Sequence, residues 1–128
     1  MIINKGFTEK ENEVFNKVRA LLSLDLIPEK YQDKKIDNLM YGHCYHATLA
    51  MYKLLGGKES GYKIKSTFDN EGIKHYWLEI DNRIIDPTIE QYTDLNRELP
   101  YSNDKTRSDH RLSKAAKYLI KEIEDRNE

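Results

Sequence analysis

The sequence predicts an α+β fold in which a central helix packs on a small antiparallel sheet of about three strands, flanked by N- and C-terminal helices. Two observations predict this fold class. Apolar residues recur at helical spacing in three stretches, residues 8–27, 44–55 and 112–123. Between the second and third stretch, residues 62–86 show the alternating, β-branched pattern of strands, interrupted by turn residues.

Length and composition indicate one folded domain over residues 1–128. A chain of 128 residues supports one modest core and is too short for two ordinary ones. Hydrophobic residues make up 38% of the chain and charged residues 34%, but the apolar residues form periodic clusters that disordered chains lack. The formal net charge of −1 provides no field to attract phosphate backbones, so we expect no nucleic acid partner.

The cysteine content and the lack of long apolar segments predict a cytoplasmic protein. The lone cysteine, Cys44, cannot form an intramolecular disulfide, and the first six residues lack the apolar core of a secretory signal. No apolar run approaches the roughly 20 residues that span a bilayer, so no membrane partner is expected.

The first helix begins at a capping box. The Thr8 hydroxyl can accept from the Glu11 N–H while the Glu11 carboxylate reaches back to the cap. An apolar stripe follows at helical spacing, and Pro28 ends the helix at or before Ile27. Residues 28–41 are charged and rich in turn formers, which indicates a surface connection.

The second helix begins near Cys44 and runs to Leu54 or Leu55, where Gly56-Gly57 ends it. Small residues at Ala47 and Ala50 allow this helix to approach a neighbouring element closely, as suits a buried helix lying against a sheet. Cys44 is then expected at the rim of the core.

Three strands account for residues 62–86. Residues 62–68 and 73–80 are extended in pattern and are separated by a predicted turn at residues 69–72. A tight turn at Asp81-Asn82 leads into residues 83–86, and Pro87 stops the pairing. This pattern predicts an antiparallel meander.

The turn at Asp81-Asn82 determines whether two polar residues meet. If the loop has two residues, Ile80 pairs with Arg83, and His75 and Asp86 become diagonal neighbours on one face. A three-residue loop or a bulge would place one of the two on the opposite face.

The C-terminal third ends in an amphipathic helix. Residues 88–111 lack clear periodicity and are expected to be irregular and surface-lying. From Leu112 onward apolar residues follow the helical rule, with Ser113 near the start, so a final helix packs on the domain.

The candidate catalytic residues are Cys44, His75 and Asp86. A cysteine at a helix N-terminus faces free N–H groups and the positive end of the helix dipole, which favours its thiolate form. Thiol-based acyl transfer also needs an imidazole as base and acid and a carboxylate to orient it, the roles predicted for His75 and Asp86. The Cys44 N–H is a candidate oxyanion donor, and no cofactor is needed.

Three further residues, His43, Trp77 and Gln91, are predicted to bind substrate around this site. Structural alternatives exist for every candidate. A lone cysteine is often a small buried hydrophobe, and an aspartate before proline is often a turn former. No metal site is expected at His43 and His46, because no second cysteine is present and Cys44 and His46, two residues apart on a helix, point to different sides.

The order of a cysteine at a helix start, a histidine on a strand and an aspartate on the next strand resembles the transglutaminase-like and papain-like cysteine enzymes. These include arylamine N-acetyltransferases and bacterial cell-wall peptidases. Within that superfamily the chain looks like small bacteriophage proteins at Gly42-His43-Cys44-Tyr45, His75-Tyr76-Trp77-Leu78-Glu79 and Ile85-Asp86-Pro87-Thr88. The resemblance implies a papain-like or transglutaminase-like fold with Cys44, His75 and Asp86 as its triad.

Two functional hypotheses follow. The first is a hydrolase or acyltransferase that acts on an amide, isopeptide or thioester bond of a protein or peptide, with transglutaminase-type cross-linking as a weaker variant. The second is a non-enzymatic, phage-encoded interaction or inhibitor module that keeps the triad scaffold for binding. A phage-encoded protein would act in the host cytoplasm.

Overall fold

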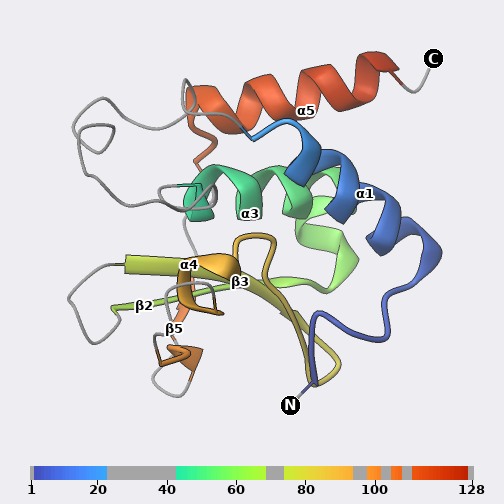
Figure 1. Ribbon diagram of the computed structural model, residues 1–128. Coiled ribbons are helices and arrows are strands. Elements are labelled where there is room, and N and C mark those ends of the chain that lie inside the picture. The colour runs from blue at the N-terminus through green and yellow to red at the C-terminus, as the bar shows by residue number, and fades with distance from the viewer. Residues whose placement is uncertain are drawn as a thin grey trace.

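Figure 1 shows the computed structural model of the chain, in which helices α1, α3 and α5 lie together on one side of a mixed sheet. The structure describes residues 2–22, 43–68, 74–93, 98–101, 105–107 and 111–126. The α+β class predicted from the sequence is confirmed, since separate helices pack on a sheet whose central strands are antiparallel.

The sheet contains five strands in the order β1-β4-β3-β2-β5. The predicted meander forms its centre, with antiparallel pairs between β2 (Lys63–Phe68), β3 (Lys74–Ile80) and β4 (Arg83–Ile85). The predicted turn at residues 69–72 lies outside the described residues.

Two short edge strands complete the sheet and correct the sequence-based prediction. β1 (Ile2–Ile3) pairs in parallel with β4, and β5 (Lys105–Arg107) pairs antiparallel with β2. The expectation of about three antiparallel strands is therefore wrong in number and in the direction of β1. Strands of two and three residues are too short to show an alternating pattern, and their pairing depends on partners far along the chain.

The turn between β3 and β4 has the predicted two-residue form. Asp81 and Asn82 both adopt positive φ angles, 48° and 63°, as the two central residues of a type I′ turn require. Ile80 consequently pairs with Arg83, so the predicted register is confirmed.

Helix α1 (Glu9–Ala20) begins at the predicted capping box. The Thr8 Oγ1 accepts from the Glu11 N–H at 3.1 Å, and a Glu11 carboxylate oxygen accepts from the Thr8 N–H at 2.9 Å. The surface connection predicted for residues 28–41 lies outside the described residues.

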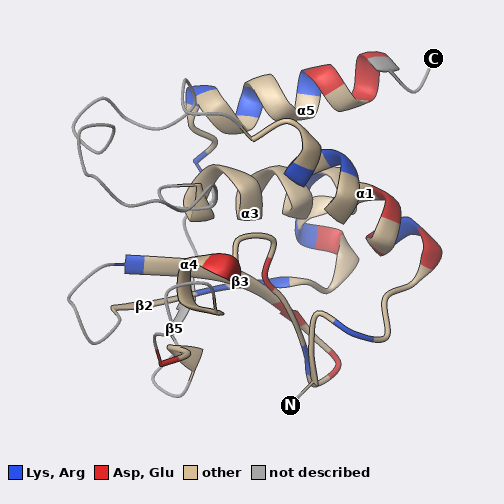
Figure 2. Cartoon of the chain, in the orientation of Figure 1, with Lys and Arg blue, Asp and Glu red and all other residues tan. Residues whose placement is uncertain are grey.

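Helix α3 (Cys44–Leu54) has the predicted bounds and forms the centre of the helical layer. Gly56, with a φ of 117°, follows its last residues and leads into the 3-10 helix η2 (Gly57–Ser60). Figure 2 shows few charged residues on α3, while α1 and α5 carry many. This distribution agrees with α3 lying buried between the sheet and the two outer helices.

The final helix, α5 (Lys114–Arg126), also forms as predicted, and the Ser113 Oγ accepts from the Ala116 N–H at 3.1 Å at its start. Within residues 88–111, expected to be irregular, the structure instead contains β5 and a short helix, α4 (Glu90–Thr93). No described helix combines the length and apolar character needed to cross a membrane.

The two faces of β3 carry different groups. Tyr76 and Leu78 belong to the hydrophobic core formed with α1, α3 and α5. His75 and Trp77 alternate with them and so point to the opposite face, where the ring of Tyr92 from α4 packs edge-on against His75 at 4.8 Å. The sheet therefore separates an apolar helical core from a smaller aromatic and polar cluster.

Candidate active site

Cys44 is the first residue of α3 and lies against the first residue of β3. Its side chain is 8% exposed, and its Sγ donates a long hydrogen bond of 3.6 Å to the Lys74 carbonyl oxygen. Helix α3 has no side-chain cap at its N-terminus, where His43 is the capping residue. The thiol thus lies at the rim of the core, beside the positive end of a helix.

His75 and Asp86 are in direct contact. The His75 Nε2 lies 2.6 Å from the Asp86 Oδ2, and both side chains are buried, with exposures of 1% and 0%. Because a carboxylate only accepts, the Nε2–H of His75 is the donor. The two-residue turn at Asp81-Asn82 produces this contact by fixing the pairing of β3 with β4.

The Cys44 thiol also acts on His75. Burial by itself lowers the pKa of His75, but the charge and hydrogen bond of Asp86, together with Cys44, outweigh it and raise the pKa above its ordinary value of 6.5. No hydrogen bond of ordinary geometry reaches the His75 Nδ1 from any described residue. The thiol is therefore close enough to influence His75 electrostatically while its Sγ is directed to the Lys74 carbonyl.

Two residues that follow Asp86 hold its carboxylate in place. The Thr88 N–H donates to Asp86 Oδ1 at 3.1 Å, and the Tyr101 hydroxyl donates to Asp86 Oδ2 at 2.6 Å. With His75, these donors satisfy both oxygens of a fully buried carboxylate, which compensates the cost of its desolvation.

The backbone of Asp86 is fixed from the N-terminal end of the chain. The Asn4 side-chain amide donates to the Asp86 carbonyl at 2.9 Å, and its Oδ1 accepts from the Asp86 N–H at 2.7 Å. Asn4 directly follows β1, so its amide extends the pairing of β1 with β4 by one more step.

Aromatic rings surround His75. Trp77 stacks beside it with ring centroids 6.0 Å apart, and Tyr101 packs edge-on against Trp77 at 4.9 Å. The Trp77 Nε1, like the His75 Nδ1, is buried without a hydrogen-bond partner among the described residues.

His43 and His46, which flank Cys44 in the sequence, form a separate buried pair. The His43 Nδ1 lies 2.6 Å from the His46 Nε2. Burial lowers the pKa of His43 to about 4, and burial with the nearby His43 lowers the pKa of His46 further. Both rings are therefore neutral at neutral pH, one donating to the other.

The three residues predicted to bind substrate lie in the interior. His43 is 1%, Trp77 0% and Gln91 4% exposed. His43 contacts His46, and the Gln91 Oε1 accepts from the Thr88 hydroxyl at 3.0 Å. All three are therefore buried and present almost no surface to a ligand.

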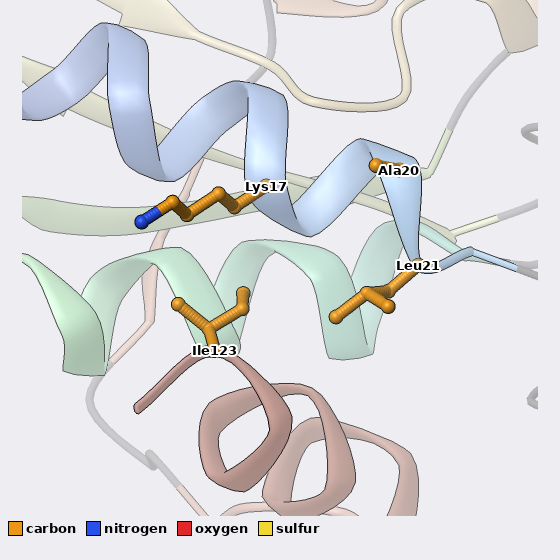
Figure 3. Close-up of a pocket in the computed structure, with 4 residues that line it drawn as sticks. All are labelled: Lys17, Ala20, Leu21 and Ile123. Carbon is orange, nitrogen blue, oxygen red and sulfur yellow. The ribbon is translucent and has the colours of Figure 1, made fainter. Parts of the chain in front are cut away.

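No group of three His, Cys, Asp or Glu side chains suited to a metal ion occurs among the described residues. A pocket of about 180 Å³ lies between α1 and α5, on the helical side of the sheet and away from His75 and Asp86. Figure 3 shows the residues that line it, Lys17, Ala20, Leu21 and Ile123.

The model of the family described as YunG protein matches residues 10–127, almost the whole chain. The chain belongs to the YunG family. Neither the curated proteins nor the solved structures contain a match to it.

Membership of the YunG family corrects the resemblance inferred from the sequence. The assignment to the transglutaminase-like and papain-like superfamily, and to small bacteriophage proteins within it, is wrong, because the family that matches is a different one. The order of a cysteine, a histidine and an aspartate on a helix and two strands is too short a pattern to identify a superfamily. What supports a function for this YunG protein is therefore its own geometry.

The residues that sequence reasoning missed are those that hold Asp86, namely Asn4 and Tyr101. Both are far from Asp86 in the sequence and lie in segments without periodicity, so no local pattern marked them. Thr88, two residues after Asp86, was detectable, since a Thr or Asp side chain often bonds backbone two residues away.

Proposed function

We propose that this YunG protein is a cysteine-nucleophile enzyme, a hydrolase or acyltransferase that acts on an amide, isopeptide or thioester bond of a protein or peptide. The observation that carries the proposal is the position of His75. Its Nε2–H donates to the buried Asp86 carboxylate, its Nδ1 has no hydrogen-bond partner among the described residues, and Cys44 is close enough to raise its pKa.

The hydrogen bond to Asp86 fixes the tautomer that this chemistry needs. With the Nε2–H of His75 donating to Asp86, Nδ1 is the ring atom that takes the proton of the Cys44 thiol, and the raised pKa of His75 keeps that proton on the imidazolium at neutral pH. The resulting imidazolium is stabilised by Asp86, and the thiolate lies at the N-terminus of α3. For this transfer the thiol turns from the Lys74 carbonyl toward His75.

The proposed reaction proceeds in two halves. The Cys44 thiolate forms a bond to the carbonyl carbon of the substrate, the carbonyl electron pair moves onto oxygen, and the Cys44 N–H stabilises that oxyanion. When the oxyanion collapses, the bond from the carbonyl carbon to the leaving nitrogen or sulfur breaks, and the leaving amine or thiol takes the proton from His75 Nδ1. Water or an acceptor amine then attacks the thioester carbon and gives a proton to His75 Nδ1. The carbon–Sγ bond breaks, the acid or the new amide departs, and Cys44 returns to the thiolate beside the His75 imidazolium.

The reactivity of Cys44 toward iodoacetamide tests this proposal. Since Cys44 is the only cysteine in the chain, all thiol labelling reports on it. We expect labelling at neutral pH to be faster than that of a small free thiol, despite the limited exposure of Cys44. His75→Ala should slow it by about tenfold or more, because the thiolate loses its imidazolium partner.

His46→Gln is the matched control, since it replaces another buried histidine of the same region that does not contact Asp86. It should leave the labelling rate close to that of the wild type. Labelling no faster than a free thiol, or equal rates in His75→Ala and the wild type, would reject the enzyme and favour an interaction module that does not use Cys44 chemically.

An activated ester such as p-nitrophenyl acetate separates the two enzyme classes. Intact-mass measurement should detect an acetyl group on the wild-type chain and none on Cys44→Ser. Loss of the acetyl group to water indicates a hydrolase, and faster loss with transfer to an added amine indicates an acyltransferase. The absence of any acetyl adduct would contradict acyl-transfer chemistry at Cys44.

A further inference from the structure

One oxygen of Asp86 accepts two short hydrogen bonds. The Oδ2 lies 2.6 Å from the His75 Nε2 and 2.6 Å from the Tyr101 hydroxyl, whereas the Oδ1 accepts from Thr88. Tyr101 thus donates to the same oxygen, Asp86 Oδ2, that accepts the hydrogen bond from His75. It lies 15 residues beyond Asp86, in a segment without helix or strand periodicity.

The Tyr101 hydroxyl remains a donor throughout the neutral range. Burial raises the pKa of Tyr101, and the negative charge of Asp86 and its hydrogen bond raise it further, with smaller contributions from Tyr92 and Glu90. Its ring packs edge-on against Trp77, which in turn stacks on His75. Ring packing and hydrogen bonding therefore both fix the direction of the hydroxyl.

We propose that Tyr101 is a positioning residue for the His75–Asp86 pair, whose hydroxyl fixes the Asp86 Oδ2 and shares that oxygen with the His75 Nε2–H. The importance of this role for catalysis rests on the proposed function. The positioning itself depends only on the two hydrogen bonds that Asp86 Oδ2 accepts from His75 and Tyr101. Tyr101 does not touch the thiol or any reacting atom.

Sharing an acceptor has a definite physical consequence. Each donor withdraws electron density from Oδ2, so each weakens the bond that the other makes. Tyr101 consequently keeps Asp86 from rotating away from His75 and from drawing the imidazole proton too strongly. Among the described residues, the other titratable groups that act on His75 or Tyr101 are Cys44 from α3 and Glu90 and Tyr92 from α4.

The experiment follows the His75 Nε2 proton by NMR at neutral pH in protein labelled with ¹⁵N-histidine, with His75→Gln used to assign the signal. Tyr101→Phe removes the hydroxyl and keeps the ring on Trp77. We expect the His75 Nε2 proton to move downfield, because Oδ2 then has a single strong donor.

Tyr62→Phe is the matched control, because the Tyr62 hydroxyl donates to a different buried carboxylate, Glu11 Oε2, at the same distance of 2.6 Å. Both variants should lower the free energy of unfolding, but only Tyr101→Phe should move the His75 proton. A merely structural Tyr101 would give two stability losses and no shift, and that result would overturn the proposal.

A second replacement keeps the test valid if Tyr101→Phe does not fold. Replacing Tyr101 with 3,5-difluorotyrosine retains the hydroxyl and makes it a stronger donor, so the His75 proton should move upfield. A downfield move or no move would overturn the proposal. Both readouts are independent of thiol reactivity, so a failure of the proposed function, seen as an unreactive Cys44, is distinguishable from a failure of this inference.

Discussion

Asn4 and Asp86 exchange two hydrogen bonds across 82 positions of sequence. The Asn4 amide donates to the Asp86 carbonyl at 2.9 Å and accepts from its N–H at 2.7 Å, while the Asn4 N–H donates to the Ile84 carbonyl at 2.8 Å. The side-chain amide thereby makes the two hydrogen bonds to the Asp86 backbone that the main chain of one further β1 residue would make. These bonds hold in place the backbone that carries the Asp86 carboxylate.

Asn4→Gly removes this amide and keeps the backbone conformation, because the φ of 51° at Asn4 suits glycine. We expect a loss of about 1 to 3 kcal/mol in the free energy of unfolding, measured by denaturant titration, since two buried backbone groups lose their partners. The matched control is Asn82→Gly, where an exposed turn residue with a φ of 63° should change little. Equal effects of both substitutions would contradict the role of Asn4.

Glu11 is a buried carboxylate that joins α1 to β4. Arg83 donates to both of its oxygens, at 2.7 and 3.0 Å, and Tyr62 donates to Oε2. Burial alone raises the pKa of Glu11, but the hydrogen bonds from Arg83, Tyr62 and Thr8 outweigh it and lower the pKa to about 2. Stability from this group is therefore present above the ordinary pKa of 4.5 and is lost as the pH falls toward 2.

Glu11→Gln should accordingly lower the free energy of unfolding by about 2 to 4 kcal/mol at neutral pH, with a smaller difference from the wild type at about pH 3. Glu13→Gln is the control, since Glu13 pairs with Lys17 on the exposed helix surface at 2.7 Å and its replacement should change the stability little. A loss for Glu11→Gln that does not vary with pH would contradict the linkage.

His75 should make the protein less stable in alkali. Its pKa is raised in the folded state, so the stability it contributes is full below its ordinary pKa of 6.5 and is lost as the pH rises through the folded value. We expect the wild-type free energy of unfolding to fall above about pH 7 by up to about 1.4 kcal/mol per pH unit. His75→Gln should flatten this slope, and an unchanged slope would show that His75 is not held as an imidazolium.

The His43–His46 pair should make the protein less stable in acid, the opposite of the effect of His75. Burial lowers the pKa of both rings, so the unfolded chain takes up protons first and stability is lost as the pH falls from 6.5 toward 4. His46→Gln keeps a hydrogen-bonding side chain and removes one titrating group. Denaturant titrations at several pH values in this window should give a shallower slope for the variant, and parallel curves would refute the assignment.

Local sequence determined most of the helices and the register in which β3 pairs with β4. The capping box at Thr8 and Glu11, the break at Gly56, and the turn at Asp81-Asn82 depend on residues that contact one another within a few positions. Because a strand alternates with a period of two, fixing that one turn was enough to place His75 and Asp86 on the same face.

Only the tertiary structure decided what surrounds that pair. The amide of Asn4 and the hydroxyl of Tyr101 reach Asp86 from positions 82 residues before it and 15 residues after it, and the edge strands β1 and β5 join the sheet from equally separate segments. Such contacts form because the folded chain must satisfy buried polar groups wherever a partner is available in space, and no spacing in the sequence records which partner that is. The pairing of His75 with Asp86 follows from a two-residue turn, but the buried setting that fixes their protons follows from the whole fold.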